Sequence, residues 1–433
     1  MQTSFSKAQR QDPVTAQSEK ILRACVHCGF CTATCPTFVL LGDERDSPRG
    51  RIYLIKGMLE KNRPADETTV RHVDRCLSCL ACMTACPSGV HYMHLIDHAR
   101  SYIEKTHRRP FADRVLRAFL AAVLPYPSRF RLALAAASTV KPFHPLFLRL
   151  GRTGRRIAAM LQLAPEPGRN PPMGPQAGRP DAPLRGLVAR AALLRGCVQQ
   201  VIRPEINAAA ARLLYKFGVE TVKAEGEGCC GALSHHLGKD AQALAEARAN
   251  IDSWTAEIEQ RGLDAILVTA SGCGSMIKDY GFLLRNDPAY AQKAAKISSL
   301  TKDVTEFLAA LDLPEPAAPQ RLAVAYHSAC SLQHGQKIDS LPRELLRRAG
   351  FEVRSIPENH LCCGSAGTYN VLEPGLADRL RDRKIANIMQ TSPDIVAAGN
   401  IGCIVQIASG TKVPVLHTVE LLDAAYGGPQ PWR

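Results

Sequence analysis

The chain of 433 residues is 46% hydrophobic, 22% charged and 6% aromatic. These proportions are typical of a globular protein and exclude collagen-like and disordered chains, and the length suggests about three folding units. The first twenty residues contain no apolar leader, and no run of ~18 apolar residues occurs. We therefore expect a cytoplasmic protein whose sixteen cysteines serve metal or redox chemistry rather than disulfides.

The first predicted unit, residues 1–105, is helical and contains eight cysteines in two groups. Ser47 followed by Pro48 is a typical helix start, and the apolar residues after it recur near one face. The 40 residues between Cys35 and Cys76 are too many for a compact bacterial ferredoxin. Their helical pattern suggests the larger α-helical ferredoxin type.

The eight cysteines form two copies of C-x2-C-x2-C-x3-C-P. In two-cluster ferredoxins the first three cysteines of such a run bind one iron–sulfur cube and the fourth binds the other. We therefore expect two [4Fe-4S] clusters, with the following ligands: Cys25, Cys28, Cys31 and Cys86 for cluster 1, and Cys76, Cys79, Cys82 and Cys35 for cluster 2. Zinc and disulfides are the weaker alternatives. Because four cysteines would leave no spare coordination site on the iron of either cluster, this unit is predicted to carry electrons. No catalytic residue is assigned.

The second predicted region, residues 106–183, is a basic helical segment followed by a linker rich in Pro and Gly. Of the net charge of +14, residues 100–156 supply 13 Lys or Arg against only Glu104 and Asp113. Apolar residues recur among these arginines, as in helices that lie on an anionic membrane or a partner subunit. The alternative is a helix that packs on its own domain with its charges in water. Nucleic acid is not expected, because no common nucleic-acid-binding motif accompanies the basic segment.

From residue 184 onward, short apolar runs alternate with longer amphipathic ones, which predicts α/β units with parallel strands. Two tandem copies are expected, residues 184–315 and 316–433, because the cysteines recur at offsets of 133, 133 and 130 residues. Gly218 and Gly262 stand where helices should end. The candidate redox or cluster-binding cysteines are Cys197, Cys229, Cys230 and Cys273 in the first copy, and Cys330, Cys362, Cys363 and Cys403 in the second.

Four thiolates per copy equal the ligand count of one cluster, and parallel strands would gather them at their carboxyl ends. Ordinary buried thiols are the alternative. Gly226, Gly228 and Gly231 match G-x-G-x-x-G, but the second copy lacks the first two glycines, so a dinucleotide site is not expected there. Four histidines are candidate ligands or proton relays, or else ordinary polar residues: His235, His236, His327 and His417.

The order of two ferredoxin-type runs and two CCG motifs resembles the iron–sulfur subunits of glycolate oxidase, anaerobic glycerol-3-phosphate dehydrogenase and heterodisulfide reductase. The stretch from Cys25 to Lys56, SGCG around Cys273 and CCGSAGTYN from Cys362 are most similar to the glycolate oxidase subunit, and the resemblance covers almost the whole chain. It implies an α+β multidomain protein that consists of an α-helical ferredoxin domain and two α/β CCG domains.

The resemblance also implies a function. Flavoprotein subunits that carry FAD would oxidise glycolate to glyoxylate, and this chain would relay the electrons toward a quinone or another membrane acceptor. Peripheral association with the inner face of the cytoplasmic membrane would follow. In heterodisulfide reductases the CCG pattern ends in C-x-x-C. Here neither Cys273 nor Cys403 is followed by a second cysteine three residues later. Whether further clusters occupy the CCG domains therefore stays open.

Three alternative functions remain at this point. The flavin subunit of the complex would select the substrate, so lactate or glycerol 3-phosphate could replace glycolate. The CCG half could itself reduce a disulfide or quinone, as in heterodisulfide reductase. A redox sensor or scaffold without a flavoprotein partner is the third alternative.

Overall fold

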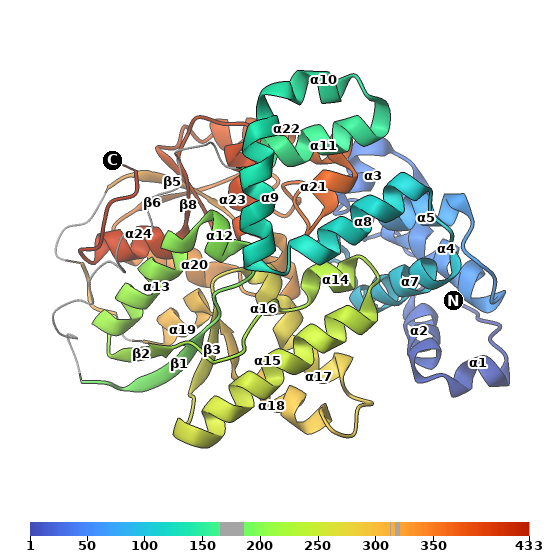
Figure 1. The fold of residues 1–433 in the computed structure, drawn as a ribbon, viewed down its shortest axis with the longest axis horizontal. Helices are drawn as coiled ribbons and strands as arrows, with labels where there is room; N and C mark the ends of the chain where they lie inside the picture. The colour runs from blue at the N-terminus through green and yellow to red at the C-terminus, as the bar shows by residue number, and fades with distance from the viewer. Residues whose placement is uncertain (165–185, 312, 317–320, 433) are drawn as a thin grey trace.

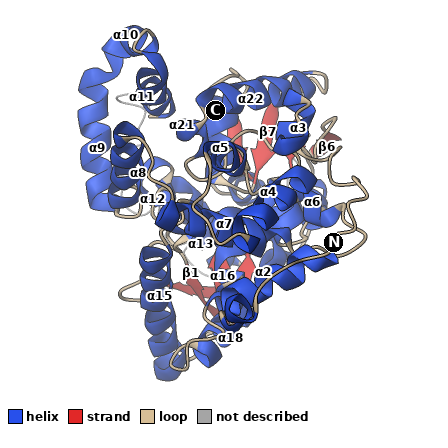
Figure 2. Cartoon of the chain, turned by 90° about the vertical axis from the view of Figure 1, so that its right-hand side faces the viewer, coloured by secondary structure: helices blue, strands red, loops and turns tan. Residues whose placement is uncertain are grey.

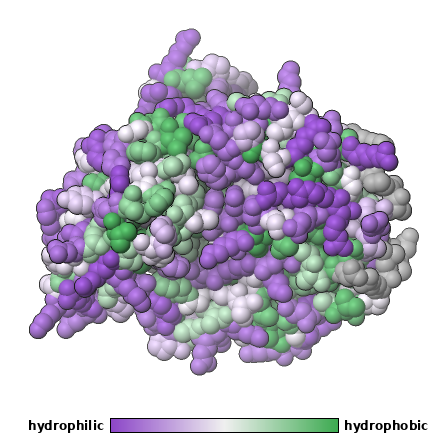
Figure 3. Space-filling view, turned by 180° about the vertical axis from the view of Figure 1, so that it is seen from behind, coloured by the Kyte–Doolittle hydropathy of each residue, from purple (hydrophilic) through white to green (hydrophobic). Residues whose placement is uncertain are grey.

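The computed structural model describes residues 1–164, 186–311, 313–316 and 321–432. The predicted Pro- and Gly-rich linker, residues 164–183, lies outside the described residues apart from Ala164. Figure 1 shows three regions: helices of the N-terminal region, a group of helices that rises above the rest, and two α/β units. No helix in the described parts of the chain is long and apolar enough to cross a bilayer. The face seen in Figure 3 is largely hydrophilic, with hydrophobic patches between the polar side chains.

The N-terminal region is helical, as the sequence predicts. Its elements are α1 (Lys7–Gln11), α2 (Pro13–Ala24), α3 (Pro36–Leu41), η1 (Glu44–Asp46), α4 (Pro48–Glu60), α5 (Glu67–Asp74), α6 (Ala81–Thr84) and α7 (Tyr92–Thr106). The expected helix start at Ser47 is confirmed, because the Ser47 side chain accepts a hydrogen bond from Gly50 N at 2.9 Å and Pro48 occupies the first turn. Ile55 and Leu59 on this helix are buried in the core that α2, α5 and α7 complete.

The basic segment folds into helices that we call the arm: α8 (Phe111–Val123), α9 (Pro127–Val140), η2 (Lys141–Phe143), α10 (His144–Leu148) and α11 (Gly151–Leu163). In Figure 2 the arm stands at one side of the molecule. It is held there through α11, which packs on α21 (Tyr369–Leu372) and α22 (Pro374–Met389).

Not all arginines of the arm and the loop before it point into water. Arg109 and Arg117 are buried and pair with Asp74 at 2.6 and 3.1 Å, while Arg156 pairs with Asp113 at 2.7 Å. Part of the basic segment therefore packs on its own protein, with these arginines in ion pairs rather than in water, and its binding to a membrane or partner surface stays a prediction. Arg109 and Arg117 fasten the arm to Asp74 of the N-terminal region, and the exposed arginines of the segment remain accessible at the surface.

The predicted α/β alternation is confirmed in both copies. The first copy contains β1 (Ala189–Leu193), α12 (Gln199–Ile202), α13 (Pro204–Lys216), β2 (Val219–Val222), α14 (Ala232–His236), α15 (Asp240–Arg261), β3 (Ala265–Val268), α16 (Ser271–Lys278), α17 (Tyr280–Leu283), α18 (Ala291–Leu300), β4 (Thr301–Asp303) and α19 (Val304–Ala310). Its sheet is parallel, in the order β2-β1-β3-β4.

The second copy repeats this topology with β5 (Ala323–His327), η3 (Ser331–Gly335), α20 (Ser340–Arg348), β6 (Glu352–Ser355), α21, α22, β7 (Ile395–Ala398), α23 (Ile401–Ala408), β8 (Val415–His417) and α24 (Thr418–Ala425). The sheet order is β6-β5-β7-β8, again parallel. One hydrophobic core spans both copies, and α13 packs on α24 across them. This shared core fixes the cysteine ends of the two sheets relative to each other.

The glycine after each cysteine pair is required by its surroundings. Gly231 and Gly364 have φ values of +88° and +92°, which L side chains rarely adopt. A Cβ atom on them would lie 2.9 Å from Ala243 O and 2.4 Å from Ala377 O. The CCG motif therefore packs the cysteine loop closely against α15 in the first copy and against α22 in the second.

Candidate iron–sulfur sites

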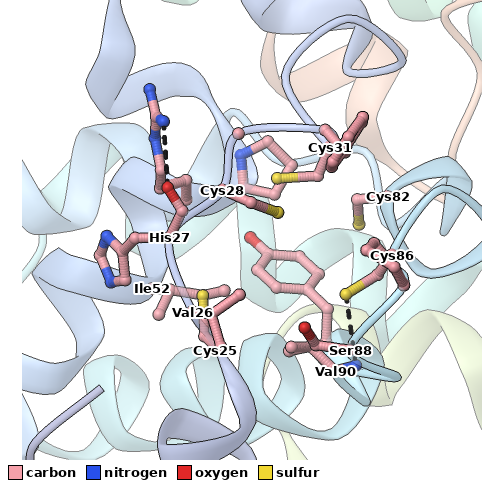
Figure 4. A pocket seen from close by; sticks show the side chains of 16 residues that line it. Cys25, Val26, His27, Cys28, Cys31, Ile52, Cys82, Cys86, Ser88 and Val90 are labelled. Carbon is pink, nitrogen blue, oxygen red and sulfur yellow. Dashed lines mark hydrogen bonds between the residues drawn. The ribbon is translucent and has the colours of Figure 1, made fainter.

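The first site, which we call the outer cavity, has a volume of about 430 Å³. Figure 4 shows Cys25, Cys28, Cys31, Cys82 and Cys86 around one space, with their sulfur atoms turned toward it. Three of them come from the loop between α2 and α3, which begins where Cys25 ends α2. Cys28 is exposed. The structure thus brings Cys86 to the first cysteine run, as the sequence predicts for cluster 1.

The second site, which we call the inner cavity, has a volume of about 310 Å³ and is lined by Cys35, Cys76, Cys79 and Cys82. Cys35 precedes α3 and so points away from the rest of its own run. Cys82 and Tyr92 line both cavities, so the two sites are neighbours. These four cysteines are the set that the sequence predicts for cluster 2.

Several groups donate hydrogen bonds to these sulfur atoms. Backbone N–H groups of Ser78 and Val90 lie 3.5 Å from the sulfurs of Cys76 and Cys86, and Tyr92 Oη lies 3.8 Å from Cys76 Sγ. Such donors suit sulfur in its thiolate form, which is the form that binds metal.

Burial, by contrast, opposes bare thiolates in these cavities. It raises the pKa of Cys31 to about 11 and that of Cys82 well above its ordinary value. Positive charge from iron would compensate for this cost, and none of the sixteen cysteines is in a disulfide. The donors and the cysteine sets therefore fit a [4Fe-4S] cluster in each cavity, which would store and pass single electrons.

A buried charged network adjoins the inner cavity, and no sequence motif indicates it. Arg51 donates from Nη1 toward Cys35 Sγ at 3.7 Å and from Nε to His72 O at 2.6 Å. Asp46, which is also fully buried, accepts hydrogen bonds from Arg51, Arg75 and His72. The charge of Arg51 is therefore fixed beside one cysteine of the inner cavity.

The cysteines of the first CCG copy gather at the carboxyl ends of β1, β2 and β3, as expected for a parallel sheet. Hydrogen bonds from Cys197 and Cys230 lower the pKa of Cys229 well below its ordinary value, against the effect of burial. Asn250 Nδ2 and Tyr280 Oη hold the loop by donating to the carbonyls of Cys229 and Cys230, each at 2.8 Å. The G-x-G-x-x-G match is part of this cysteine loop, and Asn250 Oδ1 accepts from Gly228 N.

The second copy gathers its cysteines in the same way. Cys330 Sγ lies 3.9 Å from Cys362 Sγ, and ligand atoms of His327, Cys363 and Cys403 all lie within 4.8 Å of one another. Asn400 donates to Cys403 Sγ at 3.6 Å. His327 is thus a candidate ligand, as the sequence allowed.

The other three candidate histidines have polar partners of their own. His417 caps α24 and contacts Thr269 O at 2.7 Å. His235 and His236 both face Asp97 of α7. Burial opposes a charge on His235, but Asp97 and Asp240 outweigh it and raise the pKa of His235 to about 10. This pair joins the first CCG copy to the N-terminal region.

The four cysteine sites adjoin one another in space. Cys79 of the inner cavity and Cys362 belong to one buried cluster, against which Cys330 packs. Cys330 in turn lines a large cavity together with all four cysteines of the first CCG copy. The sites therefore follow one another from the exposed Cys28 to the interior between the two CCG copies.

Comparison with known proteins agrees with this architecture. Residues 24–90 match the model of the 4Fe-4S dicluster domain, and residues 191–278 and 324–408 each match the cysteine-rich domain. A crystal structure of a hypothetical protein from Helicobacter pylori shares the fold, with a TM-score of 0.56 over 97% of this chain and 73% of that one, at 10% identity.

Two relatives match almost the full length of this chain and of their own. The glycolate oxidase iron–sulfur subunit of Escherichia coli K12 is 42% identical over 98% of this chain and 99% of its own length. The probable glycolate oxidase iron–sulfur subunit of Bacillus subtilis 168 is 31% identical over 93% and 94%. Lactate utilization protein A of Bacillus licheniformis is 26% identical but covers only 53% of this chain. With its dicluster domain, its two cysteine-rich domains and these full-length matches, the chain belongs to the glycolate oxidase iron–sulfur subunit family.

Proposed function

We propose that this protein is the electron-transfer subunit of a complex that oxidises glycolate or a related 2-hydroxy acid. FAD-containing flavoprotein subunits would oxidise the substrate, and this chain would pass the electrons toward a membrane quinone. The observation that carries the proposal is the pair of adjacent cavities into which the eight N-terminal cysteines converge. The proposal includes the division of the chain into four regions, which are residues 1–105, 106–183, 184–315 and 316–433.

The ligand assignment is also part of the proposal. Cys25, Cys28, Cys31 and Cys86 would hold cluster 1 in the outer cavity, and Cys35, Cys76, Cys79 and Cys82 would hold cluster 2 in the inner cavity. The lining of the two cavities supports this division, although Cys82 borders both. Its backbone position in α6, within the second run, favours the inner cluster.

The flavoprotein would dock at the outer cavity. Cys28 is exposed there, and the side chains of Val26 and Phe30, on either side of it, are 66% and 67% exposed. Exposed apolar side chains next to a redox site are typical of a surface that a partner covers. The inner cavity adjoins the outer cavity, and Cys79 of the inner cavity belongs to the same buried cluster as Cys362 of the second CCG copy.

Peripheral attachment to the inner face of the cytoplasmic membrane would involve the arm. Its exposed apolar side chains include Phe111, Leu132 and Leu146, and Arg114 and Arg131 are exposed near them. Apolar and basic groups together suit an anionic lipid surface.

The test is metal analysis followed by reduction with the natural donor. Protein purified without oxygen should contain about eight iron and eight sulfide per chain in the N-terminal region. Glycolate added together with the flavoprotein subunits should produce the low-temperature EPR signal of reduced clusters. Zinc without sulfide, or clusters that dithionite reduces but the flavoprotein with glycolate does not, would contradict the proposal.

A second candidate function rests on the 3.9 Å contact between Cys330 and Cys362. Thiols this close could exchange with a disulfide substrate, as an enzyme acting at the CCG sites would require. Replacing Cys229 and Cys362 with Ser should then abolish turnover with an intact flavoprotein. Unchanged turnover would reject this alternative.

A further inference from the structure

A large cavity lies between the arm and the two CCG copies. Its volume is about 2100 Å³, and it is open to solvent. We call it the arm cavity. On the side of the arm, the cavity is bounded where α9 packs beside α12 and α11 packs beside α21. The loop residues Leu77 and Ser78, next to Cys76, line both this cavity and the inner cavity.

The lining divides into two chemically different ends. The arm contributes almost purely apolar side chains, among them Leu120, Phe130, Leu134, Val140, Ile157 and Met160. The opposite end contains several polar side chains and five cysteines, which are Cys197, Cys229, Cys230, Cys273 and Cys330. A ligand that fills both ends needs a long hydrocarbon part and a compact polar, redox-active part.

The polar end also contains an unused hydrogen-bonding atom. Gln199 is 2% exposed, and its Nε2 donates to Thr269 Oγ1 at 2.6 Å. Its Oε1 has no hydrogen-bond partner among the described residues. A buried carbonyl oxygen without a donor is costly, and a ligand hydroxyl group that reached this atom after a movement of the side chains around it would remove that cost.

We propose that the arm cavity is the binding site of a membrane quinone, with its ring at the cysteine end and its hydrocarbon tail between α9 and α11. This inference rests on the proposed function, which it deepens by placing the electron acceptor. Reduction of the quinone to the quinol takes two electrons from the reduced flavoprotein partner and two protons from water. The quinol hydroxyl would then donate to Gln199 Oε1.

The position of the arm explains how such a ligand reaches the site. The apolar lining belongs to α8, α9 and α11. Exposed apolar side chains occur on α8 and α9, and exposed arginines occur on all three helices. An arm that lies on the membrane would let the tail pass directly from lipid into the cavity. A water-soluble acceptor would not need an apolar lining of this size in order to bind.

Direct labelling of the wild-type protein tests the site without any variant. A decyl-benzoquinone that carries a photoreactive azide at the end of its decyl chain should label peptides from residues 111–163, and unlabelled decyl-benzoquinone should prevent this. Decyl alcohol should not compete, because it offers the tail without the ring. Labels confined to other parts of the chain, or equal competition by decyl alcohol, would overturn the inference in favour of a different acceptor site or a lipid-chain site.

A matched pair of variants in α9 tests the position more closely. Ala133 lines the cavity, whereas Ala135, two residues along, is exposed and does not. Ala133→Trp should weaken binding of decyl-benzoquinone, measured by equilibrium dialysis, by about tenfold or more, and Ala135→Trp should change it less than about twofold. Circular dichroism melting shows whether both variants fold. Equal affinity of the two folded variants would contradict the proposal.

The outcomes separate the two proposals. If glycolate and the flavoprotein reduce the protein but decyl-benzoquinone neither binds nor labels the arm, the relay function stands and the quinone site is wrong. If the quinone labels the arm but the flavoprotein cannot reduce the protein, the relay function fails and the cavity is a quinone site with another role.

Discussion

The guanidinium of Arg51 and the sulfur of Cys35 form a buried pair in which Nη1 lies 3.7 Å from Sγ. Arg51 is 1% exposed, and Asp46, its acidic partner, is fully buried. A fixed positive charge beside a cluster ligand stabilises the reduced, more negative state of the cluster. The pair therefore favours electron arrival at the inner cavity.

Replacing Arg51 with Gln should lower the reduction potential of the inner cluster by tens of millivolts, as measured by EPR-monitored redox titration. Arg51→Lys keeps the charge and should keep most of the potential. Arg49→Gln is the control, because Arg49 borders the outer cavity instead. Loss of Arg51 also leaves the buried Asp46 with one cation fewer, at a cost of about 3 kcal/mol in unfolding free energy. An unchanged potential in a folded Arg51→Gln protein would show that the charge has no such effect.

Iron content can test the crossed ligand sets. If Cys86 belongs to the cluster of Cys28, the double variant Cys28→Ser, Cys86→Ser damages one cluster and should keep about four iron atoms. The double variant Cys79→Ser, Cys86→Ser damages both and should keep almost none. The reverse result would mean that each run binds a cluster by itself.

Stability should decline in alkaline solution because of His235. Its pKa, ordinarily 6.5, is raised to about 10 in the folded protein by Asp97 and Asp240. A raised folded pKa means that the protonated form stabilises the fold fully below pH 6.5, and that this contribution is lost as the pH rises through about 10. The Tm of the wild type should therefore fall across this range.

His235→Gln removes the titrating group and should flatten this part of the Tm profile while lowering Tm at neutral pH. The expected cost at neutral pH is about 3 kcal/mol, because Asp97 and Asp240 lose a buried cationic partner. A variant with the same alkaline slope as the wild type would assign the decline to another group.

Two glycines give a matched pair of variants: Gly364, in the loop that packs against α22, and Gly375, within α22 itself. Gly364→Ala combines a φ of +92° with a Cβ that would lie 2.4 Å from Ala377 O, so it should lower the unfolding free energy by about 2 kcal/mol or more. Gly375→Ala has nothing within 4 Å of the new Cβ and lies within α22, so it should raise the free energy by about 0.5 kcal/mol. Denaturant titration measures both, and equal effects would contradict the packing argument.

Membrane binding should depend on the exposed arginines of the arm and not on the buried ones. Arg114, Arg131 and Arg149 are exposed and have no acidic partner in the parts of the chain that the structure describes. Changing all three to Gln should reduce co-sedimentation with vesicles that contain phosphatidylserine by about tenfold at low salt. Arg109→Gln should instead lower Tm, because Arg109 pairs with Asp74. Unchanged vesicle binding in the triple variant would leave the arm without a lipid role.

The sequence could predict whatever depends on local spacing. The two C-x2-C-x2-C-x3-C-P runs fix how three thiolates curl within one loop, and the alternation of strands and helices fixes parallel sheets with cysteines at their carboxyl ends. Ser47 and Pro48 begin a helix through contacts within four residues, so no distant partner is needed. The recurrence of the CCG cysteines also revealed the two copies.

The tertiary structure alone decided what depends on residues far apart in the chain. Arg51 looks like any surface arginine of an amphipathic helix until Asp46, Cys35 and the carbonyl of His72 surround it. Similarly, the sequence could not divide the arginines of the basic segment into buried and exposed ones, because Asp74 and Asp113 select them through space. The arm cavity has the same origin. Its apolar wall and its cysteine end come from separate regions, and only their packing against each other creates a site, since local propensity carries no information about which distant surfaces meet.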